Sequence, residues 1–236
     1  MYSKIGIIGD VHAEHVHLQT AIQHLKEQGA DVLLCTGDLA DGEGDLDRCV
    51  DLLMEHGVRT VRGNHDRWLL QNKARHVPDA HHRHLVSQAT VDFLEALPVQ
   101  MTVPTSQGRL LLCHGMGHND LQKIWPGTER MPIERCNILD NIIADADFNY
   151  IVNGHVHYRT LIHFQQLLLV NAGTLKRVHR PGFGLLDLDA QAIIGYELEP
   201  QVTMVRQQAL APCAQTEVFL NTQHFSGNWQ PLTLYA

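Results

Sequence analysis

The chain is predicted to be an α/β protein built around a parallel sheet. Three observations indicate this class. Short apolar runs alternate with helical patterns in the first third of the chain, each helical pattern there ends at a glycine, and polar residues follow the apolar runs. A strand–helix–strand order of this kind is typical of βαβ units, in which consecutive strands are parallel.

The first third supplies three strands and two helices. Apolar runs bounded by turn residues predict strands over residues 4–9, 30–37 and 58–63. Between them, apolar side chains at near-helical spacing predict helices over residues 14–29 and 46–57. This part of the chain therefore forms two consecutive βαβ units.

The remainder is expected to add a second sheet with antiparallel members. Helices are predicted over residues 85–97 and 132–145, with strands over 99–104 and 109–114 between them. Further strands are predicted at residues 149–154, 159–164, 166–173, 182–189 and 192–199. The runs at 110–114, 167–173 and 183–189 are assigned to this second sheet.

No linker or repeat divides the chain, so one domain is expected over residues 1–236. Its motif-bearing core covers about residues 4–175, and C-terminal strands and a tail cover about 176–236. The pattern from about residue 208 onward is mixed and predicts no definite element.

Composition excludes several classes of protein. The formal net charge is −8 and no Lys/Arg run occurs, so an extended nucleic-acid surface is not indicated. No apolar run is long enough to cross a membrane, and no signal peptide is apparent. The five cysteines form no CxxC pair, which favours free thiols and a cytoplasmic location. The oligomeric state is left open.

The apolar runs of the first two-thirds end at Asp, Asn or His. The residues concerned are Asp10, His12, Asp38, Asn64, His65, Asp66, His114, His155 and His157. In open α/β sheets, ligands bind at the carboxyl ends of the strands. These side chains are therefore expected to converge on one pocket, although they are far apart along the chain.

The donor types predict a metal centre. Without His65 and Asp66, seven oxygen and nitrogen donors remain, and such a set suits Mn, Fe, Zn, Ni or Mg. One ion rarely takes so many protein ligands. If one carboxylate bridges, the set provides four contacts to each of two ions, the arrangement used for in-line displacement at phosphorus. His65 then remains free for the reaction.

Five motifs in this order resemble the calcineurin-like metallophosphoesterase superfamily, and in particular its small prokaryotic phosphodiesterase-like branch. They are the D-x-H motif at 10–12, Gly-Asp at 37–38, GNHD at 63–66, His-Gly at 114–115 and GHVH at 154–157. The resemblance covers roughly residues 4–175. It implies a four-layer α-β-β-α sandwich with two mixed β-sheets.

The resemblance also implies a role for each motif residue. The first metal would be held by Asp10, His12, Asp38 and His157. The second would be held by Asp38, Asn64, His114 and His155, with Asp38 bridging. His65 would act as the catalytic histidine that protonates the leaving group or stabilises the charged transition state.

Elementary chemistry agrees with these roles. Two divalent ions, of which manganese is the first expectation, lower the pKa of a shared water and provide a bridging hydroxide for in-line attack. Asp66 is expected to accept a hydrogen bond from an imidazole, most plausibly His65, and to orient it. Arg67 and Arg159 flank the motifs and are candidates for contacts to the substrate phosphate, although surface salt bridges explain them equally well.

Two polar segments have plainer interpretations. The acidic stretch at residues 41–47 fails the pattern of a calcium-binding loop and is interpreted as a solvated loop in which Asp45 caps the following helix. The histidine-rich segment 74–85 is interpreted as an exposed polar loop, with a lid over the substrate as the alternative.

The favoured substrate is a small or nucleotide-like phosphoester, hydrolysed by a phosphodiesterase or phosphatase. Ser/Thr protein phosphatases and dinucleoside tetraphosphatases resemble each other in having a GDxVDRG block and a GNHE motif, whereas this chain has GDLADGEG and GNHD. A dinucleoside polyphosphate or protein phosphatase is the alternative enzyme. A non-catalytic scaffold of the same fold is the alternative of another class, and the presence of His65 weighs against it.

Overall fold

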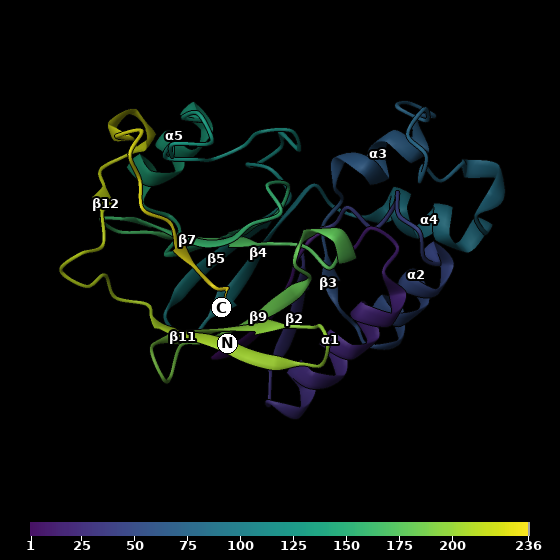
Figure 1. Cartoon of the computed structure of the whole chain (residues 1–236), viewed down its shortest axis with the longest axis horizontal. Coiled ribbons are helices and arrows are strands. Elements are labelled where there is room, and N and C mark those ends of the chain that lie inside the picture. The colour runs from purple at the N-terminus through teal and green to yellow at the C-terminus, as the bar shows by residue number, and fades with distance from the viewer. Residues whose placement is uncertain (236) are drawn as a thin grey trace.

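The computed structural model describes residues 1–235 and arranges them in four layers. Two β-sheets lie face to face in the middle. Helices α1 to α4 cover the outer side of the first sheet, and α5 with the C-terminal segment covers the outer side of the second (Figure 1). The predicted sandwich of two mixed sheets is confirmed.

The first sheet contains the parallel strands of the N-terminal third and an antiparallel extension. In sheet order its strands are β11 (Thr203–Ala209), β10 (Ala192–Glu197), β9 (Gly182–Asp187), β1 (Lys4–Ile8), β2 (Val32–Cys35) and β3 (Arg59–Thr60). β1, β2 and β3 are parallel and are connected by α1 (His15–Glu27) and α2 (Leu46–Glu55). Both predicted βαβ units are therefore present.

The second sheet is also mixed. Its strands in sheet order are β12 (Val218–Phe219), β7 (Arg159–Phe164), β8 (Leu168–Ala172), β6 (Tyr150–Asn153), β5 (Gly108–Cys113) and β4 (Gln100–Thr105), and β13 (Leu232–Thr233) pairs with β7. β5, β6 and β8 are parallel to one another, and helix α5 (Asn137–Asp145) lies between β5 and β6 in the chain.

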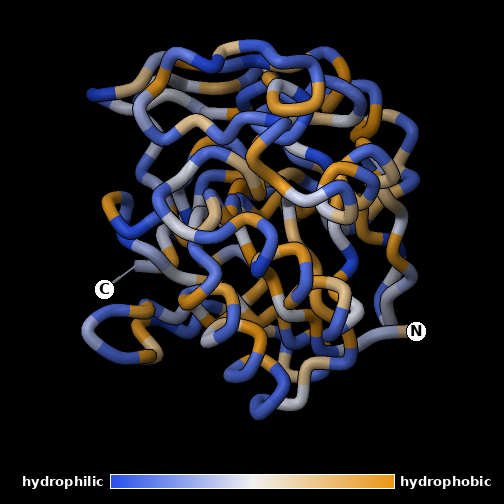
Figure 2. Tube along the Cα trace, turned by 90° about the vertical axis from the view of Figure 1, so that its right-hand side faces the viewer, coloured by the Kyte–Doolittle hydropathy of each residue, from blue (hydrophilic) through white to orange (hydrophobic). Residues whose placement is uncertain are grey.

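Side chains alternate between the layers, as the period of a strand requires. In β1, Ile7 faces the other sheet and Ile8 faces the helices. In β5, Leu112 faces the first sheet, whereas Leu111 faces the layer of α5. Three apolar clusters therefore fill the three spaces between the four layers. In Figure 2, many of the hydrophobic segments lie in the interior of the molecule.

One strand was assigned to the wrong sheet. The run at 183–189 was expected in the second sheet, but β9 pairs antiparallel with β1 in the first, with Ile5 opposite Leu186. β9 is buried along its whole length. A strand that is apolar on both faces fits either sheet, so its pattern does not specify its neighbour.

The GNHD motif begins a helix that the sequence pattern did not predict. Helix α3 (Asn64–Leu70) starts directly after Gly63, whose backbone N–H donates to the Asp66 carboxylate at 2.9 Å. An acidic residue at the third helical position stabilises the free N–H groups of a helix start. Two further helices of this layer have a side-chain acceptor at the N-cap, whereas Glu14 before α1 makes no such bond. As predicted, Asp45 accepts from Arg48 N at the start of α2, and Ser87 accepts from Thr90 N at the start of α4 (Gln88–Ala96).

Short helical turns and the C-terminal strands complete the description. The 3₁₀ turns are η1 (Arg83–Leu85), η2 (Arg177–His179) and η3 (Thr222–His224). The segment after residue 208, for which no element was predicted, supplies β12 and β13, and both pair with β7. No helix among residues 1–235 combines the length and apolar character that a membrane span requires.

Replacing Leu34 by Ala tests the layer between the two sheets. Leu34 is fully buried there, so the Leu34→Ala variant is expected to lose about 2–5 kcal/mol of unfolding free energy. Leu85→Ala is the matched control, because Leu85 is 72% exposed and its truncation is expected to change stability by less than about 0.5 kcal/mol. Urea denaturation measures both, and equal stability of the two variants would contradict this packing.

Candidate active site

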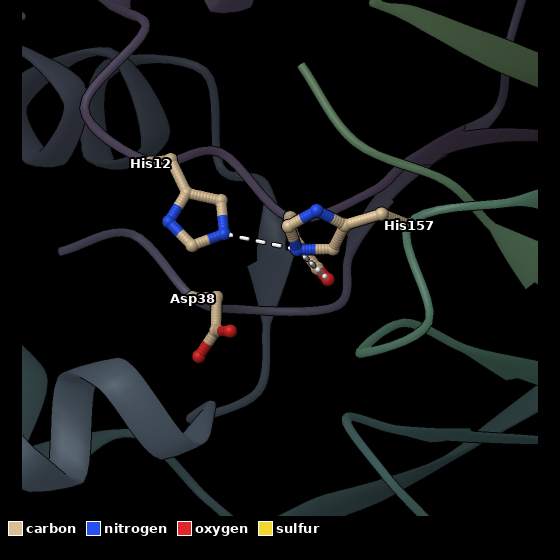
Figure 3. Close-up of side chains that lie close together, drawn as sticks. His12, Asp38 and His157 are labelled. Carbon is tan, nitrogen blue, oxygen red and sulfur yellow. Dashed lines mark hydrogen bonds and ion pairs between the residues drawn. The ribbon is translucent and has the colours of Figure 1, made fainter. Parts of the chain in front are cut away.

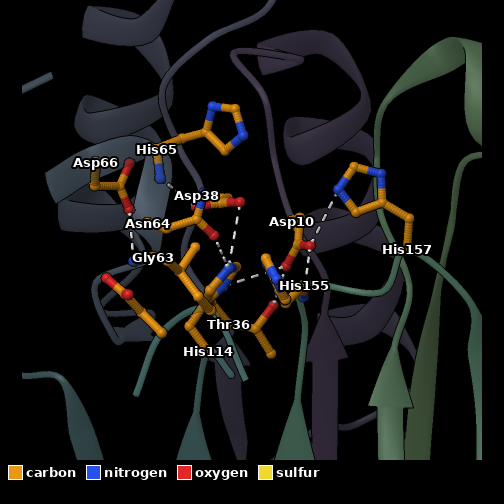
Figure 4. A network of polar contacts seen from close by, with 12 residues as sticks. Asp10, Thr36, Asp38, Gly63, Asn64, His65, Asp66, His114, His155 and His157 are labelled. Carbon is orange, nitrogen blue, oxygen red and sulfur yellow. Dashed lines mark hydrogen bonds and ion pairs between the residues drawn. The ribbon is translucent and has the colours of Figure 1, made fainter. Parts of the chain in front are cut away.

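Strands from both sheets end at one edge of the sandwich and bring their polar residues together. β1, β2 and β3 of the first sheet and β5 and β6 of the second lead into this edge (Figure 4). The side chains gathered there are Asp10, His12, Asp38, Asn64, His65, His114, His155 and His157. The structure thus places all of the sequence-predicted ligand candidates and His65 in one region.

A first group of potential ligand atoms lies within 4.8 Å of one another. It comprises Asp10, His12, Asp38 and His157. The Nε2 atoms of His12 and His157 are 3.1 Å apart, and His157 Nε2 is 3.3 Å from Asp10 Oδ2 (Figure 3). Two nitrogens that bind one ion at about 2.1 Å each lie about 3 Å apart. This group therefore has the spacing of a cation site.

A second group shares Asp38 with the first. Asp38, His114 and His155 also place one ligand atom each within 4.8 Å of the others. Asn64 extends this group, because its Oδ1 lies 3.0 Å from His114 Nε2, which is itself 3.3 Å from Asp38 Oδ2. Asp38 therefore lies where a carboxylate common to two sites would have to lie.

Hydrogen bonds to backbone carbonyls orient two of the imidazoles. His12 Nδ1 donates to the Asp41 carbonyl and His114 Nδ1 donates to the Thr36 carbonyl, both at 2.8 Å. With Nδ1 donating, the Nε2 atom of each ring faces the ligand cluster. Such bonds set the tautomer and orientation of metal-binding histidines. Burial lowers the pKa of His114, but the neighbouring Asp38 and Asp10 carboxylates outweigh burial and raise it to about 10, so a cation bound there would have to displace the Nε2 proton of His114.

The electrostatics of the cluster also suit a cation. Asp10 and Asp38 are 0% and 1% exposed, and burial raises the pKa of Asp10 to about 7, a rise that the nearby Asp38 charge supports and His114 opposes. Burial would also raise the pKa of Asp38, but His114 and His12 hold it below its usual range. Burial lowers the pKa of His12 to about 4, which favours the neutral, metal-binding form at neutral pH.

Backbone strain is concentrated in the ligand loops. The φ angles are 47° at His12, 46° at Asp38, 68° at His155 and 57° at His157. A non-glycine residue in this left-handed region costs about 1–3 kcal/mol, and such residues cluster at functional sites. The surrounding contacts must hold these four backbones in place, because the residues themselves disfavour the conformation.

Two glycines make room for the buried carboxylates. A Cβ atom at Gly63 would collide with the Asp38 carboxylate, and one at Gly154 would collide with the Asp10 carboxylate. Both glycines directly precede a predicted ligand in the chain. Their lack of a side chain therefore permits the close approach of backbone and carboxylate.

His65 is held by Asp41. His65 Nδ1 donates to Asp41 Oδ2 at 2.7 Å, and the His65 backbone N–H donates to Asp38 Oδ1 at 2.8 Å. Burial lowers the pKa of His65, but the hydrogen bond to Asp41 and the charges of Asp38 and Asp41 outweigh burial, so the pKa is raised. The ring therefore keeps Nε2 free and is biased towards the protonated form.

The expectation that Asp66 orients His65 is wrong. Asp66 is fully buried and accepts hydrogen bonds from the backbone N–H groups of Leu39, Ala40 and Gly63 at 2.8–3.0 Å. Its carboxylate ties the start of α3 to the loop that carries Asp38. As the third residue of a helix, its side chain points back towards the helix start and away from the ring of the neighbouring His65.

The acidic stretch 41–47 is only partly the solvated loop that was predicted. Asp41 is 1% exposed, and its two carboxylate oxygens each accept from Arg75 at 2.7 Å. The His81 backbone N–H also donates to it at 3.0 Å, and these bonds help to hold its pKa low against burial. The only feature of the sequence that places Asp41 near the site is its position three residues after Asp38. No sequence signal connects it to Arg75.

The segment 74–85 therefore contacts the site through two of its residues. Arg75 and His81 pack on Asp41, and Asp79 forms an ion pair with Lys176 at 2.7 Å. His76 and His84 are exposed, as predicted for a polar loop. The segment is thus fastened to the rim of the site, although part of it faces solvent.

The two arginines proposed as phosphate contacts lie in different surroundings. Arg67 forms a bidentate ion pair with Asp120 at 2.6 and 2.8 Å, which is the salt-bridge alternative. The prediction that Arg159 contacts substrate is wrong, because Arg159 is 1% exposed, donates to the Tyr196 carbonyl and lies 4.7 Å from the Tyr235 ring centroid. Its place in β7 turns the side chain into the interior.

Comparison with known proteins agrees with this architecture. Protein MJ0912 of Methanocaldococcus jannaschii, which is uncharacterized, is 25% identical over 104 residues, a match that spans 41% of this chain and only 43% of that relative. A metallophosphoesterase from Sphaerobacter thermophilus has a TM-score of 0.64 at 20% identity, covering 84% of this chain and 89% of its own. An archaeal phosphodiesterase has a TM-score of 0.52 at 15% identity, covering 83% of this chain and 99% of its own.

The calcineurin-like phosphoesterase superfamily domain matches residues 4–191. This range includes every strand end that contributes to the ligand cluster. Because the match extends over well more than half of the 236 residues, the chain belongs to the calcineurin-like phosphoesterase superfamily.

Proposed function

We propose that this chain is a dinuclear, metal-dependent phosphodiesterase or phosphatase that hydrolyses small, nucleotide-like phosphoesters. The observation that carries the proposal is the position of Asp38 in two groups of ligand atoms, each compact to within 4.8 Å. Two ions about 3.5–4 Å apart need such a shared ligand. Manganese is the first expectation, with Fe, Zn, Ni or Mg as alternatives for an oxygen and nitrogen donor set.

The residues of the site fit a pair of divalent cations. The ion-pair partners of Asp10 and Asp38 among residues 1–235 are the imidazoles of His114 and His157. Two buried carboxylates are costly unless positive charge compensates them. Burial keeps the imidazoles at His12, His155 and His157 largely neutral, whereas the pKa of His114 is raised to about 10 by the two carboxylates against burial, so His114 compensates for part of this charge. When bound, divalent ions would lower the pKa of a water to provide hydroxide and would offset the charge of the phosphate.

His65 is assigned as the proton donor. Nδ1 is occupied by Asp41, so Nε2 is the atom that can donate. As a hydroxide oxygen forms its bond to phosphorus, the bond to the leaving oxygen breaks and that oxygen keeps the electron pair. The proton on His65 Nε2 would then be transferred to it. A scaffold protein would have no use for a histidine held in this way by Asp41, which supports an enzyme over that alternative.

Metal removal tests the dinuclear centre. Chelation is expected to abolish hydrolysis of bis-p-nitrophenyl phosphate, and added Mn²⁺ should restore it. Isothermal titration should show two ions per chain in the wild type and one in His114→Ala, since His114 belongs to the second group only. His118→Ala is the matched control and should keep both, because His118 is exposed and contacts Gln100. A single ion in the wild type would contradict the proposal.

The second test removes the proton donor. His65→Ala is expected to lower kcat for the diester about 10²- to 10⁴-fold while both metal equivalents stay bound. His76→Ala, in the exposed part of the segment 74–85, should retain the wild-type rate. The assigned role of His65 is untenable if its variant turns over at the rate of this control.

The third test concerns Asp41 as the residue that positions His65. Asp41→Asn keeps the size of the side chain but removes the charge that holds the ring, so kcat should fall about 10- to 100-fold with KM and metal content unchanged. Asp51→Asn, an exposed change on α2, is the control. A loss of metal or a rise in KM without a fall in kcat would show that Asp41 acts in another way.

A further inference from the structure

A cavity of about 830 Å³ opens directly beside the ligand cluster. His155 and His157 form part of its wall, so a phosphate held at the cluster would lie at its mouth. Ligand pockets for small molecules commonly measure about 300–1,000 Å³. This cavity is therefore large enough for an organic group attached to the phosphate.

Aromatic side chains form much of its wall. Trp125, Tyr158, Trp229 and Tyr235 all line it. The ring centroids of Trp125 and Tyr158 are 5.4 Å apart, and those of Trp125 and Trp229 are 5.1 Å apart with the planes at 84°. Rings at these separations pack against one another. Trp125 and Trp229 are only 2% and 4% exposed and support the wall from behind, whereas Tyr158 is 44% exposed and is the most accessible of these rings.

Backbone hydrogen bonds hold this wall in place. Trp229 N donates to the Gly127 carbonyl at 2.9 Å, and Gly227 N donates to the Pro126 carbonyl at 3.0 Å. These bonds join the C-terminal segment to the loop after residue 124. Tyr235 completes the connection, because its hydroxyl accepts from the Arg159 N–H at 2.9 Å and donates to the His157 carbonyl at 3.2 Å.

The cavity and His65 lie on opposite sides of the cluster. His65 contacts His12 at a centroid distance of 5.0 Å, His12 contacts His157 at 4.9 Å, and His157 contacts His179, which lines the cavity, at 5.0 Å. Figure 4 places His65 and His157 at opposite ends of the network. A leaving group served by His65 would therefore point away from the cavity.

We propose that the cavity binds the organic group that stays on phosphorus, and that this group is a nucleoside. The inference rests on the proposed function. A monoester has only its leaving group, which would lie near His65 and leave the cavity without a role, so the substrate is a diester. Rings of Trp and Tyr stack on the faces of bases, and Thr128, Gln230 and Thr233 add polar groups for a sugar or base edge.

Two diesters with the same leaving group test the proposal. Thymidine 5′-(p-nitrophenyl phosphate) and ethyl p-nitrophenyl phosphate both release p-nitrophenol and differ only in the retained group. The wild type is expected to favour the thymidine ester by about ten-fold or more in kcat/KM, the scale of one base stacked on an aromatic ring. Equal kcat/KM values for the two esters would overturn the inference and leave the proposed function standing.

Variants of the cavity wall test whether its residues cause the preference for the thymidine ester. Tyr158→Leu removes a ring that is 44% exposed, so the fold should tolerate it, and it is expected to lower kcat/KM for the thymidine ester more than for the ethyl ester and so remove most of the preference for thymidine. Trp229→Leu, checked for folding by circular dichroism, should act in the same direction. Tyr2→Leu is the matched control, because Tyr2 packs against Arg59, outside the cavity. A preference that survives both cavity variants would exclude this wall as its source.

A binding measurement separates failure of the inference from failure of the proposed function. Thymidine 5′-monophosphate and ethyl phosphate are titrated into the metal-loaded protein, with tryptophan fluorescence as the readout. Tighter binding of the nucleotide, weakened by Tyr158→Leu, is expected whether or not any ester is hydrolysed. If neither diesters nor monoesters are hydrolysed, the proposed function fails. This titration alone then decides the role of the cavity, and equal binding of the two ligands would overturn its assignment.

Discussion

Two carboxylates buried at the junction of the sheets, those of Asp10 and Asp38, are the constraint on which the site depends. Each is satisfied by donors from distant parts of the chain. The Thr36 hydroxyl donates to Asp10 Oδ1 at 2.9 Å, the His155 N–H donates to Asp10 Oδ2 at 2.8 Å, and the His65 N–H donates to Asp38 Oδ1 at 2.8 Å. Because unsatisfied buried charge is costly, these bonds connect both sheets and α3 at one point.

The four acidic residues of this region have different functions because their partners differ. Asp10 and Asp38 face the imidazoles of the cluster. Asp66 accepts only backbone N–H bonds and joins α3 to the Asp38 loop. Asp41 lies between a guanidinium and an imidazole, and so couples the segment 74–85 to His65. Four carboxylates of the same chemistry thus have different surroundings within one network, and only Asp10 and Asp38 lie among the candidate metal ligands.

The chain up to residue 157 supplies the candidate metal ligands, and its C-terminal segment forms part of the cavity wall beside them. The candidate ligands are complete by residue 157, and most of them follow strands that the superfamily domain includes. The cavity wall depends on residues 229–235, which reach the ligand loop by pairing β13 with β7 and by the hydrogen bond from Tyr235 to the His157 carbonyl. The candidate ligands and the C-terminal part of the cavity wall therefore come from different segments of the chain.

The sequence by itself determined the order of strands and helices from β1 to β10, apart from α3, and the candidate residues that meet at the cluster. Both follow from local information, since the apolar period of a segment indicates its type and parallel strands end at a common edge. Only the tertiary structure decided that β9 joins the first sheet, that Asp41 rather than Asp66 holds His65, that Arg159 is buried and that the tail builds a cavity. Each of these depends on which distant segment a residue faces. A short apolar strand, or a lone Asp or Arg, is compatible with several such neighbours, and only packing of the whole chain selects one.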